Sequence, residues 1–372
     1  MIVGVPKEIK ADEYRVGMLP STVGELAAKG HEVLVETRAG EGAGIGDDEY
    51  VAADARIAAS ADEIFKRTEL IVKVKEPLKA ERAKLRRGQM IFTYLHLAPD
   101  LEQANDLMAS GVTAIAYETV TDAEGKLPLL APMSEVAGRM APQVAAHFLE
   151  RPHGGRGILL GGVEGAAPGK MVILGGGTVA RHAATVAIGM GADVTIIARS
   201  SHTIKQLTGL FGTHARIVAT GQEAIESLCK AADVVVGAAL VVGAAAPKLI
   251  SARTVAAMKP GAVIVDVAID QGGCAETSRP TTHSEPTYVI DGVVHYCVAN
   301  MPGAVPRTST FALSRATRPF VLALADKGFP RALLEDVHLR NGLNVHAGKI
   351  TSRAVADALR LPYTPATEIL RV

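Results

Sequence analysis

The chain has 372 residues, which is enough for two domains with substantial cores. Its 39 lysines and arginines balance its 39 aspartates and glutamates, so no overall charge attracts nucleic acid or an anionic membrane surface. The three cysteines form no C-x-x-C pair and indicate neither a disulfide framework nor a metal site. The most apolar stretch (234–246) is too short to span a bilayer, and the first residues do not resemble a signal peptide. We therefore expect a cytoplasmic protein.

Short apolar runs alternate with amphipathic stretches along the first third of the chain, a pattern typical of parallel α/β layers. The expected strands are 2–5, 32–36, 70–74, 90–93 and 112–116. Helices are expected between them, including 21–29 and 99–110. Ser21 is the expected N-cap of the first of these helices, and Gly30 the residue that stops it.

A long helix (132–150) and a linker rich in glycine and proline (151–169) lead into a second alternating segment. The strands expected there are 171–174, 194–197, 216–219, 234–237, 263–267 and 294–298. After Pro306 the pattern is helical as far as Gly328, and shorter helical pieces follow.

The turn after the first strand of this second segment carries a dinucleotide-binding pattern. Gly175, Gly177 and Ala180 have the G-x-G-x-x-G/A spacing, between an apolar strand and an amphipathic helix. Gly175 permits a tight turn, Gly177 lets backbone N–H groups approach a pyrophosphate, and Ala180 allows close packing of helix on strand. The helix N-terminus adds partial positive charge for the phosphates. We therefore expect a dinucleotide, with its adenine ribose near the end of the next strand, at Ala198 and Arg199.

Three polar residues of the first segment each follow an expected strand. Arg15 lies in the loop after the first strand, Lys75 ends an apolar run, and His96 follows the strand 90–93. The carboxyl ends of parallel strands share one edge, where ligands of open α/β sheets bind. Two cations there suit a small carboxylate, and a histidine can transfer protons near neutral pH. Alternatively, each cation is an ordinary surface charge and the histidine a structural hydrogen-bonding group.

The second segment offers candidates at two further strand ends. Asp270 lies in a loop just past the strand 263–267 and is the better placed of the two to face a cleft, whereas Asp266 lies inside that strand, where it is as readily a structural cap for a neighbouring loop. Asn300 follows the last strand and could contact a nicotinamide or a substrate, or instead form an Asx turn.

Over essentially its whole length the chain resembles the L-alanine dehydrogenase family. The matching blocks are Gly4-Val-Pro-Lys-Glu-Ile-Lys, Glu13-Tyr-Arg-Val, Val72-Lys-Val-Lys-Glu-Pro, Tyr94-Leu-His-Leu-Ala, Ile173-Leu-Gly-Gly-Gly-Thr-Val, Val265-Asp-Val-Ala-Ile-Asp-Gln-Gly-Gly and Asn300-Met-Pro-Gly-Ala-Val-Pro. Together these blocks are far more specific than the glycine pattern alone.

This resemblance implies reversible oxidative deamination of L-alanine to pyruvate and ammonium by a homo-oligomer, expected to be a hexamer. It assigns Arg15 and Lys75 to substrate binding and His96 and Asp270 to catalysis by proton transfer. It also implies a two-domain α/β fold, with a Rossmann dinucleotide-binding domain (131–306) inserted in a second, Rossmann-like substrate domain (1–130 plus 307–372). The cofactor-binding residues expected on this basis are Ser134, Gly175, Gly177, Thr178, Val179, Ala198, Arg199, Thr220, Ala239, Leu240, Ile269, Asp270, Asn300 and Met301.

The chain departs from the family pattern at the ribose position. Members of the family generally carry an aspartate where this chain has Ala198. A carboxylate there accepts hydrogen bonds from the ribose 2′-OH and repels a 2′-phosphate, whereas Ala198 with Arg199, Ser200 and Ser201 could receive that phosphate. We therefore expect NADP to be used, alone or beside NAD, although Arg199 could simply cover the adenine.

Two features remain open at this stage. Arg315 and Arg318 look atypical within the helix after Pro306, and the sequence gives them no role. The alternative functions are the NAD(H)-binding component of proton-translocating transhydrogenase, which would need no acid–base pair, and a catalytically silent nucleotide-binding protein.

Overall fold

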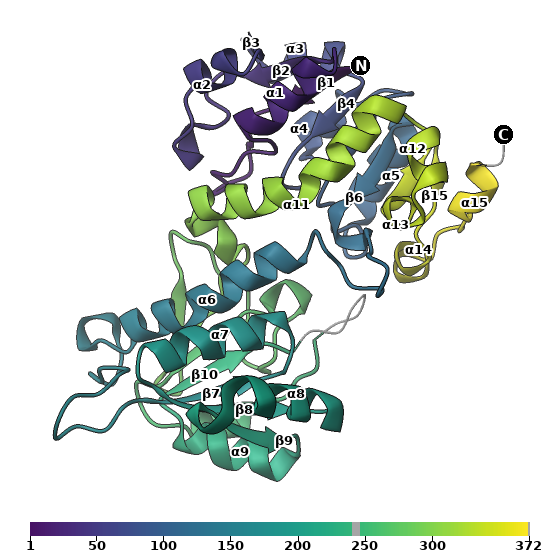
Figure 1. Ribbon diagram of the computed structural model, residues 1–372. Helices are drawn as coiled ribbons and strands as arrows, with labels where there is room; N and C mark the ends of the chain where they lie inside the picture. Colours follow the sequence, from purple (N-terminus) through teal and green to yellow (C-terminus); the bar gives the residue numbers. More distant parts are fainter. Residues whose placement is uncertain (240–245, 371–372) are drawn as a thin grey trace. The chain divides into compact units, whose positions relative to one another are not determined.

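The computed structural model describes residues 1–239 and 246–370, and its contacts divide the chain into two compact units (Figure 1). The first unit comprises Met1–Met133 and Gly303–Val372, and the second comprises Ser134–Pro302. Each unit is an α/β structure around its own sheet, so the predicted fold class is confirmed. Within the described residues no helix combines the length and the apolar character needed to cross a bilayer.

The first unit is built on an eight-stranded sheet with the order β15-β14-β6-β5-β4-β1-β2-β3. Its strands are β1 (Ile2–Val5), β2 (Glu32–Glu36), β3 (Arg56–Ala58), β4 (Leu70–Val72), β5 (Met90–Thr93), β6 (Thr113–Ala116), β14 (Leu343–His346) and β15 (Lys349–Ile350). Strands β1 to β6 pair in parallel, and β14 pairs antiparallel with β6, so the end of the chain completes the first sheet. The strand order reverses between β1 and β4, which are direct neighbours.

Helices accompany this sheet, and α1 (Pro20–Ala28) and α5 (Leu101–Ser110), for example, bury the apolar side chains Val23 and Leu26, and Ala104 and Leu107. The other helices are α2 (Asp47–Ala52), α3 (Ala61–Arg67), α4 (Lys79–Arg82), α11 (Pro306–Lys327), α12 (Arg331–Glu335), α13 (Val337–Arg340), α14 (Arg353–Leu359) and α15 (Ala366–Ile369). In α5, the Asp100 side chain accepts the N–H of Gln103, and Gly111 ends the helix in the left-handed conformation. Ala104 and Leu107 of that helix are fully buried in the core.

The second unit is built on a seven-stranded sheet with the order β12-β13-β11-β10-β7-β8-β9. Its strands are β7 (Lys170–Leu174), β8 (Asp193–Ala198), β9 (Arg216–Ala219), β10 (Val234–Gly237), β11 (Val263–Asp266), β12 (Thr287–Ile290) and β13 (Val293–Tyr296). Only β12 is antiparallel, and the order reverses between β7 and β10. The helices are α6 (Ala131–Phe148), which begins at the end of the first unit, α7 (Thr178–Gly189), α8 (Ser201–Phe211), α9 (Gln222–Ala231) and α10 (Ala252–Ala256).

The structure corrects several details of the predicted elements. Helix α1 starts at Pro20 with Leu19 as its N-cap, so Ser21 lies in the first turn and does not cap the helix. Strand β4 ends at Val72, because the following residues leave β1, although the N–H of Lys73 still reaches the carbonyl of Phe92. The sequence also missed four short strands, β3, β12, β14 and β15, and the last two replace part of the helical tail that was expected.

Candidate functional site

In the first unit, Arg15 lies in the loop after β1 and is only 2% exposed. Its Nε donates to Glu13 Oε1 at 2.6 Å, its Nη2 pairs with the other oxygen of that carboxylate, and its Nη1 contacts Met133 Sδ at 3.0 Å. Burial opposes the charge, but the hydrogen bonds that Arg15 donates to Glu13, together with the charge of that carboxylate, outweigh it and raise the pKa of Arg15. The guanidinium is therefore a fixed cation with a set orientation.

Lys75 follows β4, on the other side of the point where the strand order reverses. It is 9% exposed, its N–H donates to Glu8 Oε1 at 3.3 Å, and its carbonyl accepts the hydroxyl of Thr93 at 2.8 Å. The Glu8 carboxylate also accepts the N–H of Val74 at 2.6 Å. Glu8 therefore fixes the backbone that presents Lys75.

Beneath this backbone lies a buried ionic cluster formed by Lys73, Glu8 and Glu81. Lys73 Nζ is 3.0 Å from Glu8 Oε2 and 2.6 Å from Glu81 Oε1, and the lysine side chain has no exposed surface. Burial opposes the charge most strongly, but the two carboxylates outweigh it and raise the pKa of Lys73. One buried cation thus neutralises much of the charge of two buried carboxylates.

His96 follows β5 with its backbone in the left-handed region, at a φ of 48°. Its N–H donates to Glu118 Oε1 at 2.6 Å, and the same carboxylate accepts the N–H of Leu95 at 3.2 Å. The imidazole stacks on Tyr94, with ring centroids 5.7 Å apart and planes 8° apart, and the residue is exposed. Left-handed backbone is costly for a residue with a side chain and is common where function demands it.

Common neighbours connect the three predicted residues of this unit. Tyr94, which stacks on His96, lies within electrostatic range of Arg15, and Glu8 is close both to Arg15 and to the backbone of Lys75. A cavity of about 360 Å³ opens beside Arg15. It is lined by Lys7, Glu8, Ile9, Lys10, Asp12, Glu13, Tyr14, Arg15, Arg38, Ala39, Glu41 and Gly42, so Lys75 and His96 are not part of its lining.

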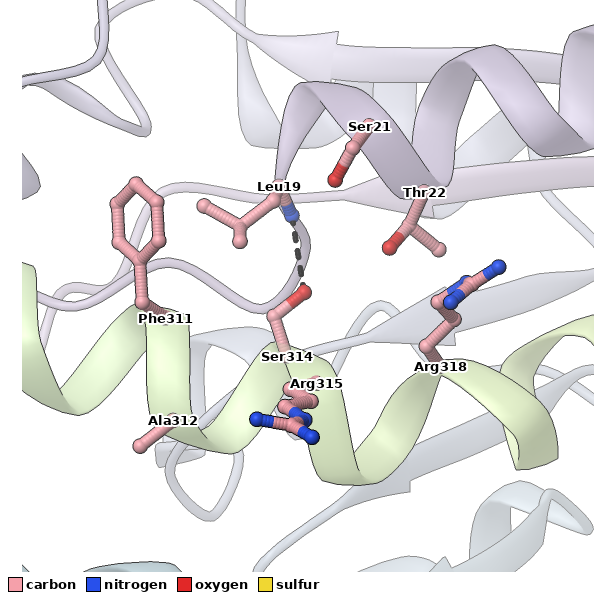
Figure 2. A pocket seen from close by; sticks show the side chains of 8 residues that line it. All are labelled: Leu19, Ser21, Thr22, Phe311, Ala312, Ser314, Arg315 and Arg318. Atoms are coloured by element: carbon pink, nitrogen blue, oxygen red, sulfur yellow. Dashed lines mark hydrogen bonds between the residues drawn. The ribbon is translucent and has the colours of Figure 1, made fainter.

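A second cavity of this unit, about 540 Å³, lies between α1 and α11 and contains none of the predicted site residues. Figure 2 shows its side chains, with Leu19, Ser21 and Thr22 on one side and Phe311, Ala312, Ser314, Arg315 and Arg318 on the other. The N–H of Leu19 donates to Ser314 Oγ at 3.3 Å across it, and Arg318 pairs with Glu25 at 2.7 Å. Arg318 thus joins α11 to α1, while nothing in the structure explains Arg315.

In the second unit, the glycine turn lies where the order of the sheet reverses, between the ends of β7 and β10. Gly175 has a φ of 129°, and a Cβ added there would lie 2.5 Å from the carbonyl oxygen of Ala238. Gly177 is the N-cap of α7, and nothing within 4 Å would meet a Cβ added to it. Thr178 and Val179 form the first turn of α7.

Ser134 approaches the same turn from α6. A Cβ added to Gly138 would lie 2.5 Å from the carbonyl oxygen of Val179, so α6 packs closely on the start of α7. Ser134 precedes Gly138 by four residues and shares its face of α6. Ser134 therefore lies on the face of α6 that packs on α7.

The remaining predicted cofactor residues follow the other parallel strands at this edge. Ala198 ends β8 and is 1% exposed, and its carbonyl accepts the N–H of Thr220, which follows β9, at 2.9 Å. Arg199 is exposed, whereas Ser200 is occupied as the N-cap of α8, because its Oγ accepts the N–H of Thr203 at 3.1 Å. Ala239 follows β10, and Leu240 lies outside the described residues.

Asp266 and Asp270 have different environments at the end of β11. Asp266 is buried and its Oδ2 accepts the N–H of Cys274 at 2.7 Å and the hydroxyl of Ser278 at 2.6 Å. It holds the loop after Asp270, which supports the structural role considered for it. Asp270 is exposed in a short 3₁₀ turn, beside the buried Ile269.

Asn300 lies just beyond β13 with a φ of 77°, and its carbonyl is 3.0 Å from His283 Nε2. Met301, the next residue, is buried. Like His96, Asn300 is a predicted site residue that holds a left-handed backbone conformation.

Comparisons with known proteins agree with these features over the full length of the chain. The family described as "Alanine dehydrogenase/PNT, N-terminal domain" matches residues 4–137, and its C-terminal counterpart matches residues 141–353. An alanine dehydrogenase of Halomonas elongata is 55% identical over 370 residues, with all of both chains covered. The chain belongs to the alanine dehydrogenase family.

Solved structures of the family show the same architecture. An L-alanine dehydrogenase structure has a TM-score of 0.93 at 50% identity, covering 97% of this chain and 99% of that one. A transhydrogenase from Sinorhizobium meliloti has a TM-score of 0.82 at 23% identity, covering 94% of this chain and all of that one, which shows a shared fold.

Sequence reasoning missed the residues that hold the candidate site residues of the first unit in place. Glu13 orients Arg15, Glu8 fixes the backbone of Lys75, and Glu118 fixes that of His96. For Glu13, the spacing of two residues from Arg15 was an available signal. For Glu118 there was none, because 22 residues separate it from His96.

Proposed function

We propose that the chain catalyses the reversible oxidative deamination of L-alanine to pyruvate and ammonium, with NAD or NADP as the acceptor. The full-length relationship to alanine dehydrogenases at about 50% identity supports this reaction. The observation that carries the assignment of residues is that, in each unit, most of the predicted residues follow parallel strands at one edge of the sheet, with Arg15, Lys75 and the glycine turn beside the point where the strand order reverses. Open α/β sheets bind their ligands at that position.

The second unit fits a dinucleotide. Position 175 requires glycine because a Cβ there would clash with the backbone of Ala238, whereas a Cβ at position 177 would point into open space. That space, in front of the N-terminus of α7, suits a pyrophosphate approached by backbone N–H groups. When bound, the nicotinamide accepts a hydride from the substrate carbon.

Arg15 and Lys75 bind the substrate carboxylate in this proposal. The bidentate pair with Glu13 orients the guanidinium, and Glu8 positions the backbone of Lys75, so the cations need little reorganisation when alanine binds. Holding the carboxylate fixes the direction of the substrate Cα–H bond.

His96 and Asp270 manage the protons of the later steps. Loss of hydride from alanine gives iminopyruvate, which water attacks before ammonia leaves. Each step needs a group that takes or gives a proton, and both residues are exposed at the edges of their sheets. Replacing His96 with alanine should abolish most alanine turnover between pH 7 and 10, while turnover at the parental rate would refute its role.

We also propose that NADP is used, alone or beside NAD. Ala198 offers no carboxylate to the ribose, and Arg199 is exposed beside it. The Ala198→Asp variant should weaken NADP use by about tenfold or more, which is about 1.4 kcal/mol, because a carboxylate repels the 2′-phosphate. Ala198→Ser controls for added size, and an unchanged NADP/NAD ratio of kcat/KM in the aspartate variant would contradict the explanation.

Absorbance at 340 nm separates the main proposal from its alternatives. Alanine with NAD or NADP should raise it, whereas nucleotide binding without any turnover would support a silent nucleotide-binding protein or a transhydrogenase component. We further propose that six copies assemble, and sedimentation should then give the mass of a hexamer.

A further inference from the structure

Three side chains that can ligate a metal meet at the C-terminal end of α6, in the second unit. They are His147 in the last turn of the helix, Glu150 just after it, and His153 in a short 3₁₀ turn. One ligand atom from each residue lies within 4.8 Å of the other two. The spacing of the cysteines predicted no metal site, but this group contains no cysteine.

The backbone fixes the spacing of these residues. The N–H of Glu150 donates to the carbonyl of His147 at 3.2 Å, and the N–H of His153 donates to the carbonyl of Glu150 at 3.1 Å. The N–H of Gly155 returns to the carbonyl of Glu150, also at 3.1 Å. The three ligands therefore follow one another at intervals of three residues on an ordered segment, so metal binding would order side chains only.

The side chains are already close to one another. The rings of His147 and His153 have centroids 3.9 Å apart, and Phe148 lies edge-on to both. Glu150 Oε2 is 3.7 Å from His153 Nε2. A cation held by two neutral imidazoles and a carboxylate has donors of the type that transition metals prefer.

We propose that His147, Glu150 and His153 form a binding site for one divalent transition-metal ion, such as Zn²⁺, Ni²⁺ or Co²⁺. Bond lengths of about 2.0–2.2 Å place two donors of one ion about 3–3.5 Å apart. The donor atoms of the three side chains now lie within 4.8 Å of one another. Because all three residues are exposed, rotation of their side chains can bring the donor atoms to the shorter separation that one ion requires. Imidazole donors disfavour Ca²⁺ and Mg²⁺, which take oxygen ligands.

The site is remote from the proposed cofactor position and serves a structural purpose. His147 follows Ser134 by 13 residues on the same helix, which is about 20 Å at 1.5 Å per residue. An ion there would join the end of α6 to the linker at 151–169, without contacting the reacting groups.

The test uses the full chain without a histidine tag, stripped with a chelator. Calorimetric titration with Zn²⁺ and Ni²⁺, and visible absorption with Co²⁺, should show one saturable ion per chain, which excess Mg²⁺ does not displace. His147→Asn, Glu150→Gln and His153→Asn should each weaken binding by at least about tenfold, the lower end of the loss seen even for supporting groups. Each variant should keep the parental alanine turnover, which shows that it is folded.

His214→Asn is the matched control, because His214 is an exposed histidine elsewhere in the same unit. It should leave the metal affinity unchanged. Absence of saturable binding to the parental chain, or binding that survives the loss of either His147 or His153, would overturn the proposal.

Discussion

Glu118 holds the backbone of His96 in a conformation that the residue would not adopt alone. A left-handed backbone costs a non-glycine residue about 1–2 kcal/mol. The hydrogen bond from the N–H of His96 to the Glu118 carboxylate, at 2.6 Å, is charge-assisted, and such bonds contribute about 1.5–3 kcal/mol. The carboxylate therefore offsets the backbone strain, and we predict that Glu118→Ala releases His96 from its position.

If the variant loses about 1–1.4 kcal/mol of preference for the observed backbone, kcat/KM for alanine should fall about fivefold to tenfold. Initial rates at 340 nm measure this fall, and titration with NADH measures cofactor binding, which we expect to stay unchanged because the glycine turn belongs to the other unit. Glu118→Gln keeps an acceptor oxygen and should recover most of the rate.

Glu124→Ala is the matched control, since Glu124 is an exposed glutamate in the same connecting segment. It should leave the kinetics unchanged. Parental kcat/KM in Glu118→Ala, or a glutamine variant as slow as the alanine variant, would refute the positioning role of the carboxylate.

Two further predictions concern buried groups. Lys73→Met should lower the free energy of unfolding by about 3–5 kcal/mol in urea titrations, because Glu8 and Glu81 stay buried without their cation. Since the folded pKa of Lys73 lies above its ordinary value of 10.5, this difference should hold through neutral pH and shrink on the alkaline side only as the pH rises through the raised pKa. On the acid side it should shrink once Glu8, whose pKa burial raises, takes up a proton. A difference that fades between pH 7 and 9 would contradict the assignment. Burial raises the pKa of Cys229 and of Cys274 to about 12, so both thiols should resist a thiol reagent at pH 8 until denaturant is added, and rapid labelling of the folded chain would show that they are not buried.

The sequence predicted those parts of the fold that rest on local patterns. Glycine spacing, apolar runs and strand ends correctly located the turn at Gly175 and the edges of both sheets. The short strands β3, β12, β14 and β15 escaped, although other strands of four residues, such as β1 and β5, were predicted from their apolar runs. Strand β14 forms by pairing with β6, which lies more than 200 residues earlier in the chain.

The candidate site was predictable for the residues that carry unusual chemistry and not for those that support them. Lys75 and His96 stand out at the ends of apolar runs, whereas Glu8 and Glu118 look like any surface glutamate. Their roles depend on contacts across 65 and 22 residues, which no local pattern encodes. The left-handed backbone of His96 was equally unreadable, because its cause is the distant carboxylate.

The three consecutive glycines show how far a motif can be interpreted without coordinates. A Cβ added to Gly175 would strike the backbone of Ala238, and one added to Gly176 would lie 2.4 Å from Thr203 Cγ2, so packing within the chain accounts for both. A Cβ added to Gly177 would meet no atom of the described residues within 4 Å, and the φ of Gly177 is −80°, which any residue can adopt. The described part of the chain therefore does not require glycine at that position, which fits the close approach of the dinucleotide that we propose. The spacing alone assigns a role to both Gly175 and Gly177, whereas the geometry of the described residues gives a packing reason for glycine at position 175 and none at position 177.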